Sequence, residues 1–272
     1  MGDRARRIAK WIVRTGIAIV VLIGAYLSVF FLPYPLFPHH LEHAGFSVYS
    51  DREIPPDFVP ILDEARVRLE TMELYCGDNP PRIFVCRSQR LFDFINRWAG
   101  KRHSGQGLLI SLAGNAFFSG PRIAEVADRH GDGLTRSRLA GSWPAAICHE
   151  TAHHLVFKHL GLFGIRGLPV WKAEGYADSQ ANLPPAALDS EDDLRARIAL
   201  VLDDASWIGP TATIDRRHFR WQTLVEFLAT VRGVTFDRLR DPELTEELAM
   251  ADMTAWYLGA CSAKISGVFQ VP

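Results

Sequence analysis

Neither sign of charge predominates in this sequence, and several marks of specialised proteins are missing. Its 272 residues carry 30 basic and 31 acidic side chains, a net charge of −1, so no overall positive field argues for a nucleic-acid partner. There is no internal repeat and no low-complexity tract, which leaves repeat architectures without support. With 48% apolar and 22% charged residues, the composition is that of an ordinary folded protein with one sizeable core.

Cysteine is scarce, with four residues in the chain. That number does not define a disulfide framework, because several pairings are possible. Cys76 and Cys86 flank a Pro-containing turn that could bring them together as a disulfide. Cys148 and Cys261 lie in apolar helical surroundings, where we expect buried thiols.

Acidic residues are absent between Asp3 and Glu42, and residues 15–32 (TGIAIVVLIGAYLSVFFL) carry no charge at all. Extended by residues 11–13, this run approaches the ~20 residues needed to cross a bilayer core. Basic residues crowd its N-terminal side, and the first Lys or Arg after it is Arg52. The positive-inside tendency then places the N-terminus in the cytoplasm. We predict a single-pass membrane protein, held in the lipid bilayer through residues 11–32, with a periplasmic or extracellular domain.

A cleaved signal peptide is the alternative to an anchor. Its apolar segment is usually about 7–15 residues long and is followed by a small-x-small cleavage site. Here the run is longer and continues into the bulky FFLPYPLFP, which favours the anchor. We therefore expect a basic tail, anchor and linker in residues 1–39 and an extracytoplasmic domain in residues 40–272. The Pro-rich segment 33–45 is predicted to be a solvated linker, and its histidines are not expected to bind metal.

From residue 46, strand and helix patterns alternate up to about residue 120, and only helical patterns follow residue 140. Strands are predicted at FSVYS (46–50) and RIFVCR (82–87), and GLLISL (107–112) with NAFFSG (115–120) predict one or two more. Helices are predicted at 55–75, 89–100, and about 142–160, 170–182, 191–204, 214–232 and 243–262. This distribution predicts the α+β class, with an N-terminal transmembrane helix followed by a small mixed sheet packed on a helical half.

The chemistry of the chain concentrates in HETAH, residues 149–153. On a helix, His149 and His153 share one face, so they can direct nitrogens to one Zn²⁺ ion. Glu150 lies beside the first histidine, where a general base can reach a water on the metal without ligating it. Two surface histidines and a solvated glutamate are the alternative. It is disfavoured because the helix is rich in apolar residues, and burying unpartnered imidazoles is costly.

The next predicted helix, VWKAEGYADSQAN, supplies acidic residues that could complete the site. A tight loop and antiparallel return would bring Glu174 opposite the two histidines, as the third protein ligand that a catalytic zinc requires. Asp178 lies one turn further along the same face. It could accept the outward N–H of one histidine and so set that ring's orientation.

HETAH followed by WKAEGYAD resembles the gluzincin zinc metallopeptidases, which combine H-E-x-x-H with a downstream glutamate. The resemblance spans about residues 46–262 and is strongest at 149–178. It implies a zincin-type active-site helix with His149, His153 and Glu174 as zinc ligands. It further implies Glu150 as the general base and Asp178 as a residue that supports the ligands.

The resemblance also suggests how substrate is held. NAFFSG resembles the sheet edge to which an extended substrate adds as a strand, so Asn115 and Ala116 would contact the substrate backbone. Such enzymes place a Tyr or His against the oxyanion, and His218 occupies the corresponding position here. Tyr176 and Tyr257 are competitors for that role, and a purely structural His218 at a helix start is equally compatible with the sequence.

These observations predict a membrane-anchored zinc metallopeptidase that hydrolyses a peptide or protein substrate through a zinc-activated water. Two alternatives stay open. The chain could be a non-catalytic, metal-stabilised binding or scaffold domain tethered to the membrane, with zinc as a folding clamp. The same site could also hydrolyse a non-peptide amide or ester.

Overall fold

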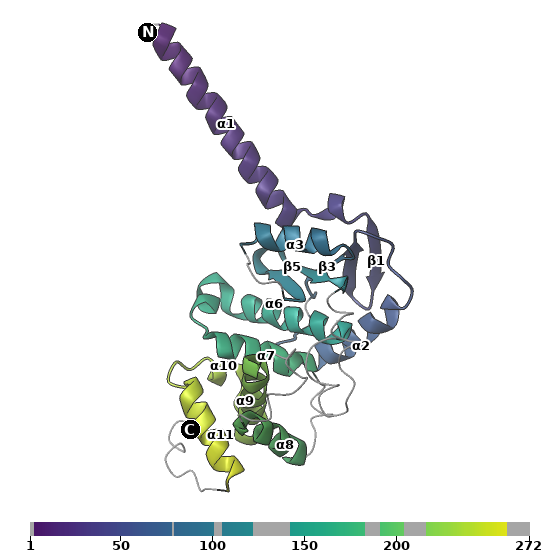
Figure 1. The fold of residues 1–272 in the computed structure, drawn as a ribbon, viewed down its shortest axis with the longest axis vertical. Coiled ribbons are helices and arrows are strands. Elements are labelled where there is room, and N and C mark those ends of the chain that lie inside the picture. The colour runs from purple at the N-terminus through teal and green to yellow at the C-terminus, as the bar shows by residue number, and fades with distance from the viewer. Residues whose placement is uncertain are drawn as a thin grey trace.

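The computed structural model describes residues 3–77, 79–100, 105–121, 142–182, 191–203 and 216–259. A long N-terminal helix leads into a five-stranded sheet, and most of the later helices lie beyond one face of that sheet (Figure 1). The sheet is mixed and most of the remaining chain is helical. The predicted α+β class with a small mixed sheet is therefore confirmed.

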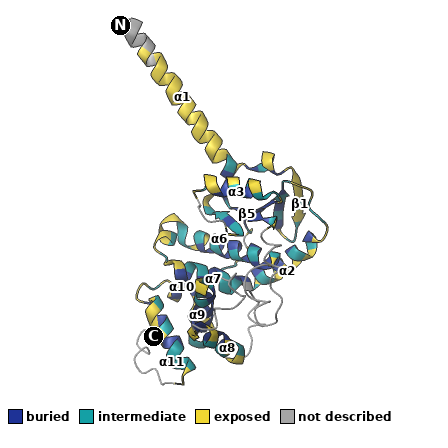
Figure 2. Ribbon diagram, viewed as in Figure 1, coloured by how far each residue is buried: buried dark blue, intermediate teal, exposed yellow. Residues whose placement is uncertain are grey.

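Helix α1 (Asp3–Phe31) projects from the rest of the molecule (Figure 1). Its segment Lys10–Phe31, 22 residues, is long and apolar enough to cross a membrane, a test that an N-terminal signal sequence also passes. Most of its apolar side chains are exposed (Figure 2). A 3₁₀ turn (Tyr34–Leu36) follows and leads into the sheet.

The sheet has the strand order β1-β2-β3-β5-β4. The outer pairs β1/β2 and β4/β5 are antiparallel, whereas β2/β3 and β3/β5 are parallel. The strand bounds are β1 His39–His43, β2 Phe46–Ser50, β3 Arg82–Cys86, β4 Gly107–Ile110 and β5 Asn115–Ser119; a second 3₁₀ turn, Ser111–Ala113, joins β4 to β5.

Strand β1 lies in the segment predicted to be a solvated linker, so that prediction is wrong. Ala44 and Gly45 have positive φ angles of 50° and 81°, the backbone that a two-residue hairpin loop requires. They pair His43 with Phe46 across the turn. The strand is hidden in the sequence because an edge strand with exposed polar side chains lacks apolar alternation. Two of its histidines contact nearby carboxylates: His40 Nε2 lies 2.8 Å from Glu42 Oε1, and His43 Nε2 lies 2.6 Å from Asp63 Oδ1.

The two faces of the sheet carry different helices. Ile83 and Val85 of β3 pack in a core with α2 (Phe58–Glu70) and α6 (Trp143–Arg166). The alternate residues Phe84 and Cys86 pack on the opposite side with α3 (Gln89–Trp98). Phe30, near the end of α1, is 5% exposed and belongs to this second core. The sheet thus separates α3 and the end of α1 from α6.

The helical half is built around α7 (Val170–Asn182), which packs against α6 on one side and α9 (Arg216–Arg232) on the other. Helices α8 (Glu191–Leu202), α10 (Phe236–Leu239) and α11 (Glu246–Tyr257) complete this half. Beyond residue 142 the described chain contains helices and no strand, as predicted. Helix α10 was not predicted, and α6 runs past its predicted end to Arg166 through a kink at Gly161 (φ 68°).

The suggested Cys76–Cys86 disulfide is not formed. Cys76 is exposed, and Cys86 is a buried free thiol. The extended strand Arg82–Cys86 carries Cys86 about 13 Å beyond the start of β3, away from the turn that contains Cys76. Cys148 is a buried free thiol, as predicted, and Cys261 lies outside the described residues.

Candidate metal centre

Helix α6 begins just before the HETAH motif, and its start is encoded locally. The Ser142 side chain accepts a hydrogen bond from the backbone N–H of Ala145 at 3.3 Å, and Pro144 occupies the first turn, where a missing N–H is harmless. One face of the helix, including Ile147, Ala152 and Leu155, packs into the core below the sheet. The two histidines are only partly buried, with side chains 21% and 18% exposed.

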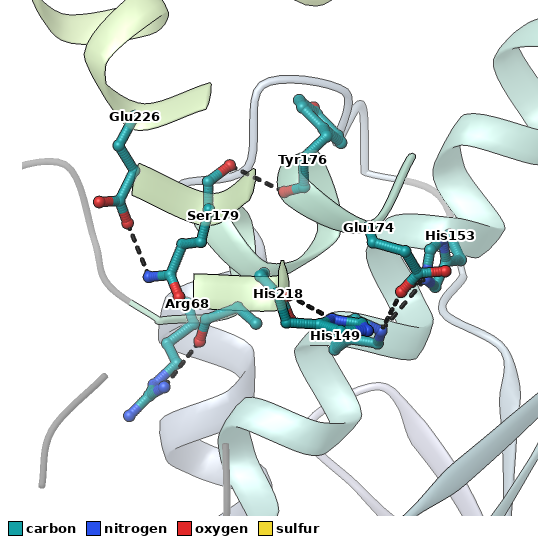
Figure 3. Close-up of polar contacts among 11 residues, drawn as sticks. Arg68, His149, His153, Glu174, Tyr176, Ser179, His218 and Glu226 are labelled. Carbon is teal, nitrogen blue, oxygen red and sulfur yellow. Dashed lines mark hydrogen bonds and ion pairs between the residues drawn. The ribbon is translucent and has the colours of Figure 1, made fainter. Parts of the chain in front are cut away.

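Three ligand-type atoms from α6 and α7 converge at one point (Figure 3). His149 Nε2 and His153 Nε2 are 3.1 Å apart, and Glu174 Oε2 is 3.5 Å from each of them. Ligands at ~2.0–2.1 Å from a tetrahedral zinc ion are separated from one another by about 3.3 Å. The triangle therefore has the dimensions of one tetrahedral face around a single zinc ion.

Asp178 lies behind this triangle and holds two imidazoles. Its Oδ1 is 2.8 Å from His149 Nδ1, and its Oδ2 is 2.9 Å from His218 Nδ1 on α9. An ionised carboxylate only accepts hydrogen bonds, so each Nδ1 donates to Asp178. The neutral His149 ring then keeps its lone pair on Nε2, directed toward His153 and Glu174 (Figure 3). Two such nitrogens and a carboxylate oxygen repel one another unless a proton or a cation lies among them.

The charges of the site shift the titration of its members. Burial lowers the pKa of His149, but Asp178 and Glu174 outweigh it, and the pKa lies well above 6.5. Burial raises the pKa of Glu174 and of Asp178, whereas the neighbouring histidines lower both, and the net pKa of each is lowered. The hydrogen bond to Asp178 raises the pKa of His218. The carboxylates of the site thus stabilise positive charge on His149 and His218.

Glu150 points toward the edge of the sheet. A Cβ atom built on Gly107 of β4 would lie 2.3 Å from Glu150 Oε1, so the carboxylate occupies the space that a side chain at position 107 would take. Glu150 is also nearly buried, at 9% exposure. The Glu150 carboxylate, next in sequence to His149, therefore lies against strand β4. Sequence reasoning missed Gly107, because nothing near it in the chain indicates contact with α6.

A second glycine sets the spacing of the helices. A Cβ atom on Gly175 would lie 2.6 Å from the Trp221 carbonyl oxygen and 2.9 Å from Val225 Cγ2. Only glycine therefore lets α7 and α9 approach this closely. Their approach brings His218 within hydrogen-bond distance of Asp178. The available sequence signal for this close approach was Gly175 itself, a glycine directly after Glu174 inside a predicted helix.

The structure does not bring every predicted substrate contact to the site. Strand β5 lies between β3 and β4, all its residues are buried, and the Asn115 amide donates to the Phe30 carbonyl oxygen at 2.7 Å. Asn115 and Ala116 are therefore not on an edge strand, and that prediction is wrong. Among the described strands, the sheet edge near α6 is β4. The consecutive apolar residues Ala116, Phe117 and Phe118, typical of a strand buried on both faces, were the signal against an edge.

The two tyrosines proposed as alternatives to His218 lie elsewhere. Tyr176 is 3% exposed and its ring packs on Phe236, on the side of α7 away from His149 (Figure 3). Tyr257 ends α11 and packs against the core of the helical half. Of the three candidates, His218 is the one that contacts Asp178, the carboxylate that in turn contacts His149.

No protein-family model matches the chain, and no curated protein matches its sequence. The candidate function therefore depends on the geometry of the site and on the motif that it contains.

Proposed function

We propose that this chain is a membrane-anchored, zinc-dependent hydrolase of peptide bonds. The observation that carries the proposal is the triangle of His149, His153 and Glu174, with edges of 3.1, 3.5 and 3.5 Å. Among the described residues, the group that could hold a metal has three members. Three protein ligands leave one tetrahedral position open, as in catalytic rather than structural zinc sites.

When bound, zinc polarises a substrate carbonyl and lowers the pKa of a coordinated water towards ~7. His149, His153 and Glu174 would hold the ion, and Asp178 would keep the His149 ring in its ligating tautomer. Glu150 would accept a proton from the attacking water and deliver it to the leaving amine. His218 donates Nδ1–H to Asp178, which raises its pKa; in its protonated form it would also present Nε2–H as a donor to the developing oxyanion.

The sheet suggests how a peptide would be aligned. Among the described residues, β4 is an edge strand, so its outer backbone groups could pair with an extended chain. Gly107 on this strand lies against Glu150, which brings the general base close to any chain added there. This alignment replaces the predicted role of Asn115 and Ala116.

An uncleaved anchor is supported by the end of α1. Phe30 is buried in the core on the α3 side of the sheet, and its carbonyl oxygen accepts a hydrogen bond from buried Asn115. Cleavage after Phe30 would remove this core side chain and leave the buried Asn115 amide without its partner. We therefore propose a retained anchor, with a cytoplasmic N-terminus and the hydrolase domain in the periplasm or outside the cell.

The decisive experiment compares the parent with Glu150→Gln, using metal analysis and cleavage of a peptide library. We expect about one zinc per chain in both proteins and loss of cleavage in the variant only. Zinc in both proteins with no cleavage of amide or ester substrates by the parent would favour the metal-stabilised scaffold. Equal activity of parent and variant would overturn the role of Glu150.

A further inference from the structure

The outward face of α3 combines two aromatic and two basic side chains. Phe94 and Trp98 are 38% and 37% exposed, and Arg90 and Arg97 are exposed on the same helix. Spacings of three and four residues bring these four side chains to one face, while Phe92 and Ile95 on the other face are buried against the sheet. We call the four exposed residues the α3 face. Aromatic and arginine side chains side by side on an amphipathic helix are typical of helices that lie in the membrane interface.

This face is joined directly to the candidate membrane span. The Phe94 ring lies 5.0 Å from that of Trp98, which stacks on Tyr26 of α1 at 5.5 Å; Tyr26 in turn contacts Phe30 at 5.4 Å. The Tyr26 hydroxyl also donates to the Trp98 carbonyl oxygen at 2.7 Å. Aromatic contacts therefore run without a break from α3 into the segment Lys10–Phe31. Figures 1 and 2 show α3, with exposed residues, beside the end of α1.

The length of the span determines where these aromatic contacts lie relative to the hydrocarbon core of the bilayer. The helix from Trp11 to Ala25 is only about 22 Å long, whereas the hydrocarbon core is ~30 Å thick. The span cannot be lengthened at its start, because Lys10 and the earlier basic residues require water or headgroups, and Arg14, one turn further on, reaches the headgroups only by extending its side chain back toward them. The turn from Tyr26 to Phe30 must therefore lie at the far boundary of the hydrocarbon core. Trp98, packed on Tyr26, is carried to the same boundary.

We infer that the α3 face docks on the lipid bilayer that α1 spans. Phe94 and Trp98 would lie at the boundary between acyl chains and headgroups, and Arg90 and Arg97 would contact the phosphates of anionic lipids. Two attachments, one spanning and one interfacial, hold the domain in a single orientation instead of leaving it on a flexible tether. Because the sheet separates α3 from α6, the metal-binding residues lie on the side away from the bilayer. The substrate peptide would then be presented outside the membrane.

The test uses the full chain in phosphatidylglycerol–phosphatidylcholine vesicles, with Cys76→Ser and Cys261→Ser as background. Cys86 and Cys148 are buried and can remain. An environment-sensitive fluorophore is attached through Phe94→Cys, or through Phe163→Cys as the matched control. Phe163 is an 83% exposed side chain on α6, across the sheet. At position 94 we expect emission to be quenched by lipid-borne nitroxide and protected from aqueous iodide, with the reverse at position 163.

Two results would overturn the inference. Quenching by iodide at position 94 as strong as at position 163 would show that the α3 face is in water. Protection from both quenchers would show that a second copy or another protein covers it.

A second experiment tests the two arginines. The fluorophore is also read in Arg90→Gln/Arg97→Gln, in vesicles with and without phosphatidylglycerol. If Arg90 and Arg97 contact lipid phosphates, phosphatidylglycerol should increase nitroxide quenching at position 94 when both arginines are present. Loss of this increase in the double variant would support the phosphate contacts, and an unchanged increase would exclude them.

Discussion

The Nδ1 atom of His149 lies 2.8 Å from Oδ1 of Asp178. This contact sets which nitrogen of the ring carries the proton, and so leaves Nε2 free to bind a metal. Asp178 also accepts a hydrogen bond from His218, so a single carboxylate links the proposed ligands to the proposed oxyanion donor. Carboxylates that orient ligating histidines contribute to metal affinity without touching the ion.

Asp178→Asn should weaken zinc binding while preserving the fold. The amide oxygen can still accept from His149 but carries no charge, and loss of such a partner typically lowers metal affinity by about 10–100-fold. Competition with a chromophoric chelator measures the change. Asp63→Asn is the control, because Asp63 contacts His43 on the far edge of the sheet and should leave affinity unaltered. Equal affinities of parent and Asp178→Asn would contradict the assigned role.

Gly107→Ala should impair turnover without removing the metal. The added methyl group would lie 2.3 Å from Glu150 Oε1, so the carboxylate must move, and misplacing a catalytic group by ~1 Å can cost ~10²-fold in rate. The measurement is kcat for a cleaved peptide together with zinc content. Gly105→Ala is the matched control, since its Cβ meets only backbone atoms at 3.6 Å or more. Parallel losses in both variants would show a general effect on β4 instead.

Gly175→Ala should destabilise the protein. Its Cβ would collide with the Trp221 carbonyl oxygen at 2.6 Å, and overpacking of this kind costs roughly 1–3 kcal/mol. Urea unfolding gives the free energy of unfolding. Gly167→Ala, at the end of α6, has its nearest neighbour at 3.7 Å and a φ of −87°, so it should be neutral or slightly stabilising. A neutral Gly175→Ala would mean that α7 and α9 can separate at little cost.

Zinc affinity should fall with decreasing pH, beginning above the ordinary histidine range. A protonated His149 cannot bind metal, and its pKa is raised well above 6.5 because Asp178 and Glu174 outweigh the effect of burial. Protons therefore compete with zinc at a higher pH than they would for an unperturbed histidine. Titrations of affinity against pH measure the onset, which Asp178→Asn should shift to lower pH. An onset at or below 6.5 in the parent would contradict the electrostatic account.

Much of the fold was predictable because its signals are local. The α6 and α7 segments have helical spacing, and the histidines of HETAH lie one turn apart wherever that helix packs. Strand β1 was missed for the opposite reason. Its polar side chains are exposed, and its pairing depends on a two-residue turn at Ala44 and Gly45 that leaves no apolar pattern.

The amino-acid sequence by itself determined the apolar span, the helix that carries His149 and His153, and the presence of Glu174 and Asp178 one turn apart on the next helix. These follow from periodicity within single elements. The tertiary structure alone decided that β4, and not β5, forms the sheet edge. It also decided that Gly107 makes room for Glu150 and that Gly175 lets α9 bring His218 to Asp178. Strand order and helix approach are set by packing between distant segments, and no local spacing encodes them.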